Sequence, residues 1–184
     1  SALQALDAKV PFITVWDDHE VANDTWSEGA ENHNEGEGDF EQRKMAALQA
    51  YFEWLPIRPW REGHHEEIYR SFSFGDLVDL HMLDTRVLAR DKQLDYADYV
   101  DGATGAMDSD RFMADVTSSE RTLLGADQLQ WLQASLLSAT GKWQVLGQQV
   151  LMGHMMLPAA IAMQKLSVYQ YAELGALAQL AARA

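Results

Sequence analysis

The chain has 184 residues, with 28 acidic and 14 basic side chains, six histidines and no cysteine. Its length fits one domain or one compact part of a larger one. A formal charge of −14 argues against a nucleic-acid-binding role, because phosphate contacts need a concentrated basic face. The lack of cysteine excludes disulfides, thiolate zinc sites and cysteine nucleophiles within these residues. No stretch approaches the roughly 20 apolar residues of a membrane span, and no signal peptide is recognisable in these residues.

The first third of the chain predicts a strand, a loop and a helix. An apolar run at residues 10–16 is typical of an inner strand covered on both faces. Residues 27–41, here named the acidic loop, carry six acids among glycines and asparagines without the ligand order of an EF-hand. The spacing of residues 40–55 predicts a helix. Its shared face would hold Ala47, Tyr51, Trp54 and Leu55.

The middle of the chain predicts a hairpin and a long excursion. A period of two at residues 68–82 indicates two strands joined by a turn at Gly75. In the first strand, Ile68, Phe72 and Phe74 share a face. In the second, Val78, Leu80 and Met82 point one way, and Asp79 and His81 point the other. Residues 89–121 have weak periodicity and many aspartates, so we expect a long excursion there.

The last third predicts a helix, a strand and further helices. Residues 126–138 form an amphipathic pattern with Leu129, Leu132 and Leu136 on one face. Residues 143–150 are typical of a second inner strand, and we expect a short helix at Pro158 and a longer one at 168–182. The order of these elements indicates an α/β fold with hairpin additions.

The strongest chemical signal follows the first predicted strand. It comprises Asp17, Asp18, His19, Glu20, Asn23 and Asp24. Polar residues at the end of an inner strand lie where open α/β folds bind ligands. Two adjacent carboxylates beside an imidazole are costly to crowd together without a cation, and hard metals prefer such oxygen ligands. The alternative is a strand-end turn in which Asp17 or Asp18 accepts backbone N–H bonds, and the spacing alone leaves both open.

The order of residues in this segment resembles that of a known family. Residues 13–26 (Ile-Thr-Val-Trp-Asp-Asp-His-Glu-Val-Ala-Asn-Asp-Thr-Trp) resemble the PhoD-like alkaline phosphatases, a branch of the metallophosphoesterase superfamily. Four further stretches agree in order and spacing, at residues 69–76, 83–86, 125–132 and 143–150. The resemblance implies two sheets packed face to face with helices outside. It also implies that the parent protein hydrolyses phosphate mono- or diesters with two or more metal ions, iron and calcium in this family.

The resemblance also implies roles for the motif residues. Asp18 takes the place of a metal ligand, His19 that of the histidine facing the phosphate, and Glu20 that of its orienting carboxylate. Asp17 either touches a metal or braces Asp18 from outside the ligand set. A histidine held in this way could protonate the leaving oxygen or stabilise charge on the phosphoryl group.

Three further residues are candidates for the same site. Gln149 lies where the superfamily often has a metal-ligating histidine, although a polar strand end is at least as good an interpretation. Asn23 and Arg86 are candidates for substrate binding. Arg86 could hold a phosphate bidentately, with a salt bridge to Asp84 or to the acidic excursion as the plainer alternative. His154 and the segment His64–Glu66 receive no ligand role.

The family's first metal-binding segments belong before Val10 and its last motif after Ala184. We therefore expect residues 1–184 to be the central part of a catalytic domain, poorly active alone and inclined to self-associate through unpaired strands. The alternative is a non-catalytic fragment or degenerate domain whose acidic loop binds calcium, or which serves a partner. A periplasmic or extracellular location is expected from the resemblance alone.

Overall fold

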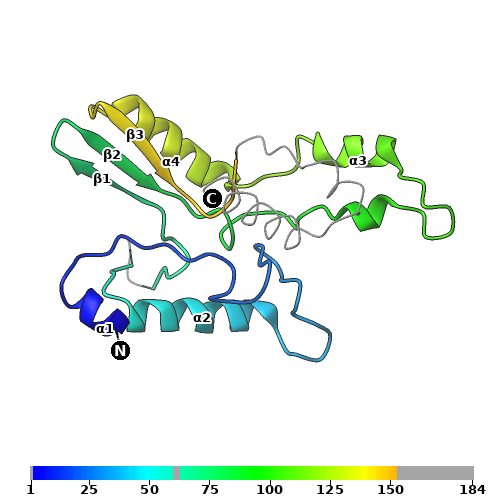
Figure 1. Ribbon diagram of the computed structural model, residues 1–184, viewed down its shortest axis with the longest axis horizontal. Coiled ribbons are helices and arrows are strands. Elements are labelled where there is room, and N and C mark those ends of the chain that lie inside the picture. Colours follow the sequence, from blue (N-terminus) through cyan, green and yellow to red (C-terminus); the bar gives the residue numbers. More distant parts are fainter. Residues whose placement is uncertain (1, 60–62, 153–184) are drawn as a thin grey trace, which may run out of the picture. The chain divides into compact units, whose positions relative to one another are not determined.

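The computed structural model describes residues 2–59 and 63–152, and residues 1–150 form one compact unit. The elements are α1 (Ala2–Asp7), α2 (Phe40–Trp54), β1 (Arg70–Phe74), β2 (Val78–Met82), the short 3-10 helix η1 (Tyr96–Tyr99), α3 (Ser109–Val116), α4 (Gly125–Ser138) and β3 (Trp143–Gly147) (Figure 1). The architecture is mixed α/β, as expected. No helix in these ranges is long and apolar enough to cross a membrane. The expected helices after Pro158, and His154, lie outside the described residues.

The three strands form one sheet in the order β1-β2-β3. The predicted hairpin is confirmed: β1 and β2 pair antiparallel, and Gly75 takes a φ of 59° in the turn, where a side chain would be strained. β3 pairs parallel with β2 on one side only within the described residues. The prediction of an inner strand is therefore wrong for β3 in this part of the chain. Trp143 and Val145 are exposed there.

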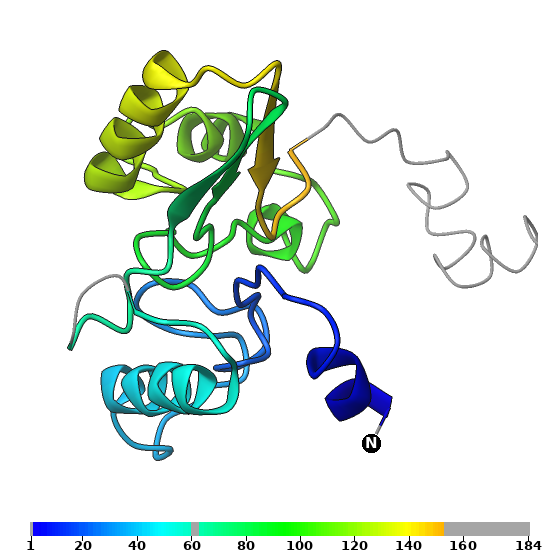
Figure 2. The ribbon, with the colours of Figure 1, turned by 90° about the vertical axis from the view of Figure 1, so that its left-hand side faces the viewer.

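The sheet buries a polar face beneath α4, which lies on one side of it (Figure 2). His81 is 2% exposed and lies between Ser71 Oγ at 2.7 Å and Gln144 Oε1 at 3.0 Å, with the Trp131 ring of α4 against it. Asp79 is buried as well, and hydrogen bonds led by the Ser73 hydroxyl lower its pKa to about 2. The alternation of polar and apolar residues alone does not predict a buried polar face. The face can be buried because each of these polar groups has a hydrogen-bond partner.

The faces of two helices differ from the predictions. In α4, Leu132 is buried but Leu129 and Leu136 are exposed, because Gln128 takes the inner position and hydrogen-bonds to the backbone. In α2, Trp54 is 86% exposed, and the helix ends one residue before the predicted end. Its buried side is instead centred on Leu48. Asp39 caps this helix by accepting the Gln42 N–H at 2.8 Å.

Residues 10–16 do not form the predicted strand. A strand needs backbone hydrogen bonds to a neighbouring strand, whereas here side chains donate to the backbone carbonyls of the segment. The Thr14 carbonyl accepts from Arg70 Nη2 at 2.7 Å, and the Trp16 carbonyl accepts from Gln149 Nε2 at 2.7 Å. The segment is nevertheless anchored, because Trp16 is fully buried in a core with Leu48 of α2.

The excursion at residues 89–121 is more ordered than expected. It contains η1, α3 and a bridge between Val100 and Met107. Its own small centre is Tyr99, which packs edge-on against the ring of Phe112. The excursion is therefore a local substructure rather than a plain loop.

Candidate functional site

The motif begins where the chain leaves the core. Trp16 packs edge-on against Tyr51 and Phe52 of α2, with ring centroids 5.5 and 6.1 Å away. The chain then turns sharply, and the Asp18 carbonyl accepts the N–H groups of Val21 and Ala22 at 3.0 and 2.9 Å. This turn exposes the side chains on either side of Asp18 while that residue stays buried.

Asp18 holds the motif together. Its Oδ2 accepts the backbone N–H of Asp24 at 2.7 Å, and Asp24 has a φ of 48°, a left-handed conformation that aspartate tolerates. This bond is the turn-bracing role that the sequence left open. Burial would raise the pKa of Asp18, but the Asp24 N–H and the charge of Arg86 outweigh it and lower the pKa. The backbone N–H of Asp18 itself also lowers the pKa of this carboxylate.

His19 lies at the open side of the turn. Its Nε2 is 3.8 Å from Asp18 Oδ2, and its side chain is 76% exposed. The imidazole is therefore accessible to a substrate while a carboxylate stands beside it. The chemistry that this permits is proton transfer or charge stabilisation at an exposed oxygen.

Glu20 and Asn23 contact other partners than the resemblance implies. Glu20 Oε2 accepts the backbone N–H of Asp17 at 2.9 Å, so this carboxylate closes the turn. The side-chain amide of Asn23 donates to Glu31 of the acidic loop. In this arrangement both side chains stabilise the segment around His19.

Arg86 joins the motif from the segment after β2. Its Nε is 2.7 Å from Asp17 Oδ1 and its Nη1 is 3.4 Å from Asp24 Oδ1, with the side chain 12% exposed. The expected alternative of a salt bridge to Asp84 is wrong, because Asp84 accepts the backbone N–H of Arg86 instead. The guanidinium therefore balances two of the motif's carboxylates.

Gln149 connects the segment entering the motif to the segment carrying Arg86. Its Oε1 accepts from the backbone N–H and hydroxyl of Thr85, at 2.9 and 2.6 Å. Its Nε2 donates to the carbonyls of Trp16 and Leu83, at 2.7 and 3.1 Å. A metal-ligating role would cost bonds to Thr85, so this geometry favours bracing.

Asp84 is a residue that sequence reasoning missed, although it lies in one of the matching stretches. It is buried, and its Oδ1 accepts the N–H groups of Arg86 and Val87 at 2.7 and 3.0 Å. Gln128 binds the Asp84 backbone on both sides, at 2.8 Å each. Burial raises the pKa of Asp84 to about 6, and the N–H groups of Arg86 and Val87 offset this rise only in part. An aspartate that closely follows a predicted strand, inside a matching stretch, is the signal that could have found it.

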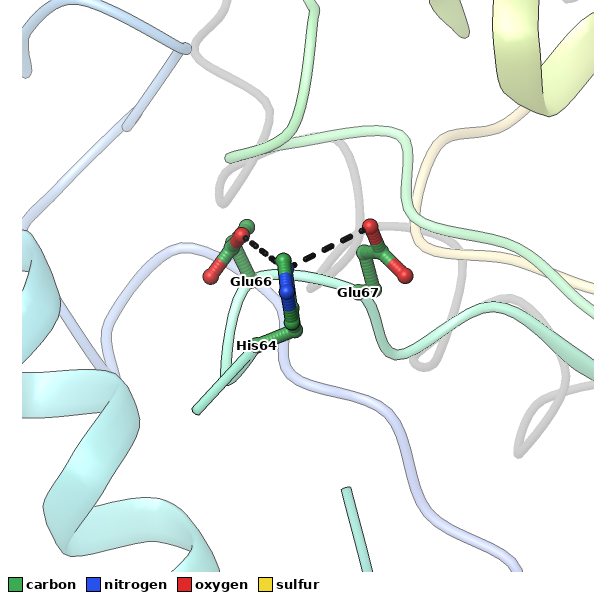
Figure 3. Close-up of side chains that lie close together, drawn as sticks. All are labelled: His64, Glu66 and Glu67. Carbon is green, nitrogen blue, oxygen red and sulfur yellow. Dashed lines mark hydrogen bonds and ion pairs between the residues drawn. The ribbon is translucent and has the colours of Figure 1, made fainter. Parts of the chain in front are cut away.

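The donors of the motif do not converge on one point in the described residues. The three-donor group that does form there is His64, Glu66 and Glu67, in the turn before β1 (Figure 3). The sequence predicted only a solvated turn at this place. The acids of the acidic loop are not gathered into such a group within the described ranges.

A pocket of about 430 Å³ lies beside the motif. Asp24 and Glu31 line it together with Trp26 and Lys92, whose Nζ lies 5.5 Å from the centre of the indole. An aromatic face, a cation and acids in one hollow can hold a polar organic group. The hollow reaches the motif through Asp24.

Comparison with known proteins tests the resemblance. The family model of PhoD-like phosphatases matches residues 1–181. The chain is 38% identical over 150 residues to alkaline phosphatase D of Bacillus subtilis strain 168, covering 80% of this chain and 24% of that protein. A solved structure described as the structure of PhoD matches with a TM-score of 0.63 and 34% identity, over 83% of this chain and 27% of that one. The chain spans about a quarter of the length of these relatives. Since the family model matches nearly every residue, the chain belongs to the PhoD-like phosphatase family.

Proposed function

We propose that the protein to which this chain belongs hydrolyses phosphate mono- or diesters. The single observation that carries this is the exposed imidazole of His19 beside the buried carboxylate of Asp18, in a chain of the PhoD-like family. The curated relative is named alkaline phosphatase D and the solved relative is described as the structure of PhoD, which supports the same chemistry here.

Each motif residue has a proposed part in the reaction. His19 donates a proton to the leaving oxygen, because its imidazole is the accessible acid beside the motif. Arg86 contributes positive charge at the phosphoryl group. To do so it gives up its ion pair with Asp24, which is the longer of its two ion pairs. Asp17 and Glu20 keep the turn in shape through the ion pair to Arg86 and the bond between them.

We propose that Asp18 stands at one edge of a metal centre. Its carboxylate is the proposed ligand, and the oxygen-rich motif around it suits iron or calcium. Such ions would lower the pKa of a bound water and neutralise the phosphoryl oxygens. Gln149 is proposed to hold Trp16 and Thr85 in place around this edge, through the contacts given above.

We further propose that the chain is the central part of a larger catalytic domain of two packed sheets. Its coverage of about a quarter of its relatives supports this, as do the exposed apolar side chains Phe74, Trp143 and Val145 on the sheet. The same exposed residues support self-association of the isolated chain. We also propose that the protein acts in the periplasm or outside the cell. Its partner is a phosphate-ester substrate, and we expect no scaffold role with nucleic acid.

The test uses the full-length protein and two chromogenic substrates, p-nitrophenyl phosphate and bis(p-nitrophenyl) phosphate. His19→Ala should lower kcat by about 100-fold or more, because a positioned acid contributes at least that much. Asp18→Ala should abolish activity and reduce bound iron or calcium. His65→Ala is the control, since this histidine packs against Phe52 of α2 and is not a member of the motif. Unchanged kcat in both motif variants would refute the proposed site.

A further inference from the structure

A turn before β1, outside the motif, brings an imidazole and two carboxylates together. Figure 3 shows His64 between Glu66 and Glu67, with its ring directed at both acids. His64 Nδ1 is 3.3 Å from Glu66 Oε1 and 3.7 Å from Glu67 Oε1. One ligand atom from each residue lies within 4.8 Å of the others.

These separations are close to those around a bound ion. Two ligand atoms about 2.1 Å from one ion, at angles of roughly 90–110°, are about 3.0–3.4 Å apart. The contact of His64 with Glu66 already falls in that range, and the contact with Glu67 exceeds it by a few tenths of an ångström. The His64 nitrogen therefore lies near coordination spacing from an oxygen of each acid.

The donor types select a class of ion. One imidazole nitrogen with two carboxylate oxygens suits zinc and similar divalent transition metals better than calcium or magnesium, which prefer oxygen ligands alone.

The three side chains are partly shielded and still accessible. Their exposed fractions are 43% for His64, 33% for Glu66 and 21% for Glu67. His64 and Glu66 also line a pocket of about 370 Å³. This space leaves room for water at the remaining coordination position, as in sites with three protein ligands.

We propose that His64, Glu66 and Glu67 bind a divalent transition-metal ion of the zinc class. The site is separate from the motif around Asp18 and does not depend on the proposed phosphoesterase reaction. Because all three ligands lie within the turn that enters β1, the ion stabilises that turn and the start of the strand.

The experiment is a titration of the metal-free chain with ZnCl2, monitored by isothermal titration calorimetry. Wild type should show one more zinc site than His64→Ala or the double variant Glu66→Gln/Glu67→Gln. A residual site in the variants should have a Kd at least about tenfold weaker, since even residues behind the ligands change metal affinity that much. The matched control is Glu28→Gln/Glu35→Gln, which removes two exposed acids elsewhere.

A spectroscopic readout separates metal binding from a simple ion pair. Zinc should shift the Nδ1 resonance of His64 in nitrogen-15 NMR at pH 7.5 and leave that of His65 unchanged. The near-isosteric glutamine variant keeps the test valid if His64→Ala disturbs the fold. Equal zinc binding by wild type and both triad variants, or no shift at His64, would overturn the proposal.

Discussion

The motif around Asp18 and the turn triad both crowd acidic side chains, but they are built in different ways. In the motif, the positive partner Arg86 comes from 69 positions away and the Gln149 contact to Trp16 spans 133 positions. In the triad, all three residues lie within four positions, and the partner of the acids is an imidazole. The motif is therefore balanced by segments that are distant in the sequence, whereas the proposed metal site of the triad is built from one short turn.

The largest effect on stability is expected from removing the side-chain hydrogen bonds of Gln149. Gln149→Leu leaves the Thr85 N–H and the carbonyls of Trp16 and Leu83 without their side-chain partner. Each buried polar group left unpaired costs about 1–3 kcal/mol, so we expect a loss of about 4 kcal/mol in the free energy of unfolding. Urea denaturation measures it, with the exposed Gln133→Leu as the control. A loss below about 1 kcal/mol would mean that the motif is not held by this contact.

The next effect is a pH dependence of stability that comes from the buried carboxyl group of Asp84. The pKa of Asp84 is raised from 3.8 to about 6, so the folded protein binds more protons than the unfolded chain between these values. Stability is then full below about pH 4 and falls by about 3 kcal/mol as the pH rises to about 6, at 1.36 kcal/mol per unit. Asp84→Asn should remove this fall, and the exposed Asp110→Asn should retain it. Identical stability profiles for wild type and Asp84→Asn would contradict the raised pKa.

A smaller effect is expected at the ion pairs of the motif. Arg86→Met keeps the apolar stem and removes the charge from Asp17 and Asp24, whose side chains are more than half exposed. Solvent screening limits the loss to about 1 kcal/mol. The pKa of Asp18 should rise, so the stability that this carboxylate contributes above its unfolded pKa is lost at a higher pH during acidification. Carbon-13 NMR of Asp18 measures this, with the exposed Arg58→Met as the control; an unchanged pKa would show that Arg86 does not act on it.

The smallest effect is expected in the triad without metal. Glu66→Gln/Glu67→Gln should change the unfolding free energy by less than about 0.5 kcal/mol in the presence of a chelator, because these contacts are partly solvated. With saturating zinc, wild type should gain thermal stability that the double variant lacks. Differential scanning calorimetry of both proteins with and without zinc measures the difference. A large loss of unfolding free energy in the presence of chelator would show that the triad stabilises the fold without metal, as the contacts of the motif do.

Local pattern alone predicted a good part of the molecule. The period of two before and after Gly75 predicted the hairpin, and the spacing of residues 40–55 predicted α2 with an error of one residue at its end. The five matching stretches identified the family. These features depend on residues a few positions apart, so the sequence carries them directly.

The partners of the polar groups were decided by the tertiary structure. Residues 10–16 looked like a strand, yet their carbonyls are bound by the side chains of Arg70 and Gln149. The face of β2 that holds His81 is buried only because Ser71 and Gln144 satisfy its ring nitrogens. The sequence by itself determined the hairpin, α2 and the motif. Which of them meet was settled by packing, because a buried polar group takes whichever partner the fold brings within reach, and no local pattern encodes a contact across more than 60 positions.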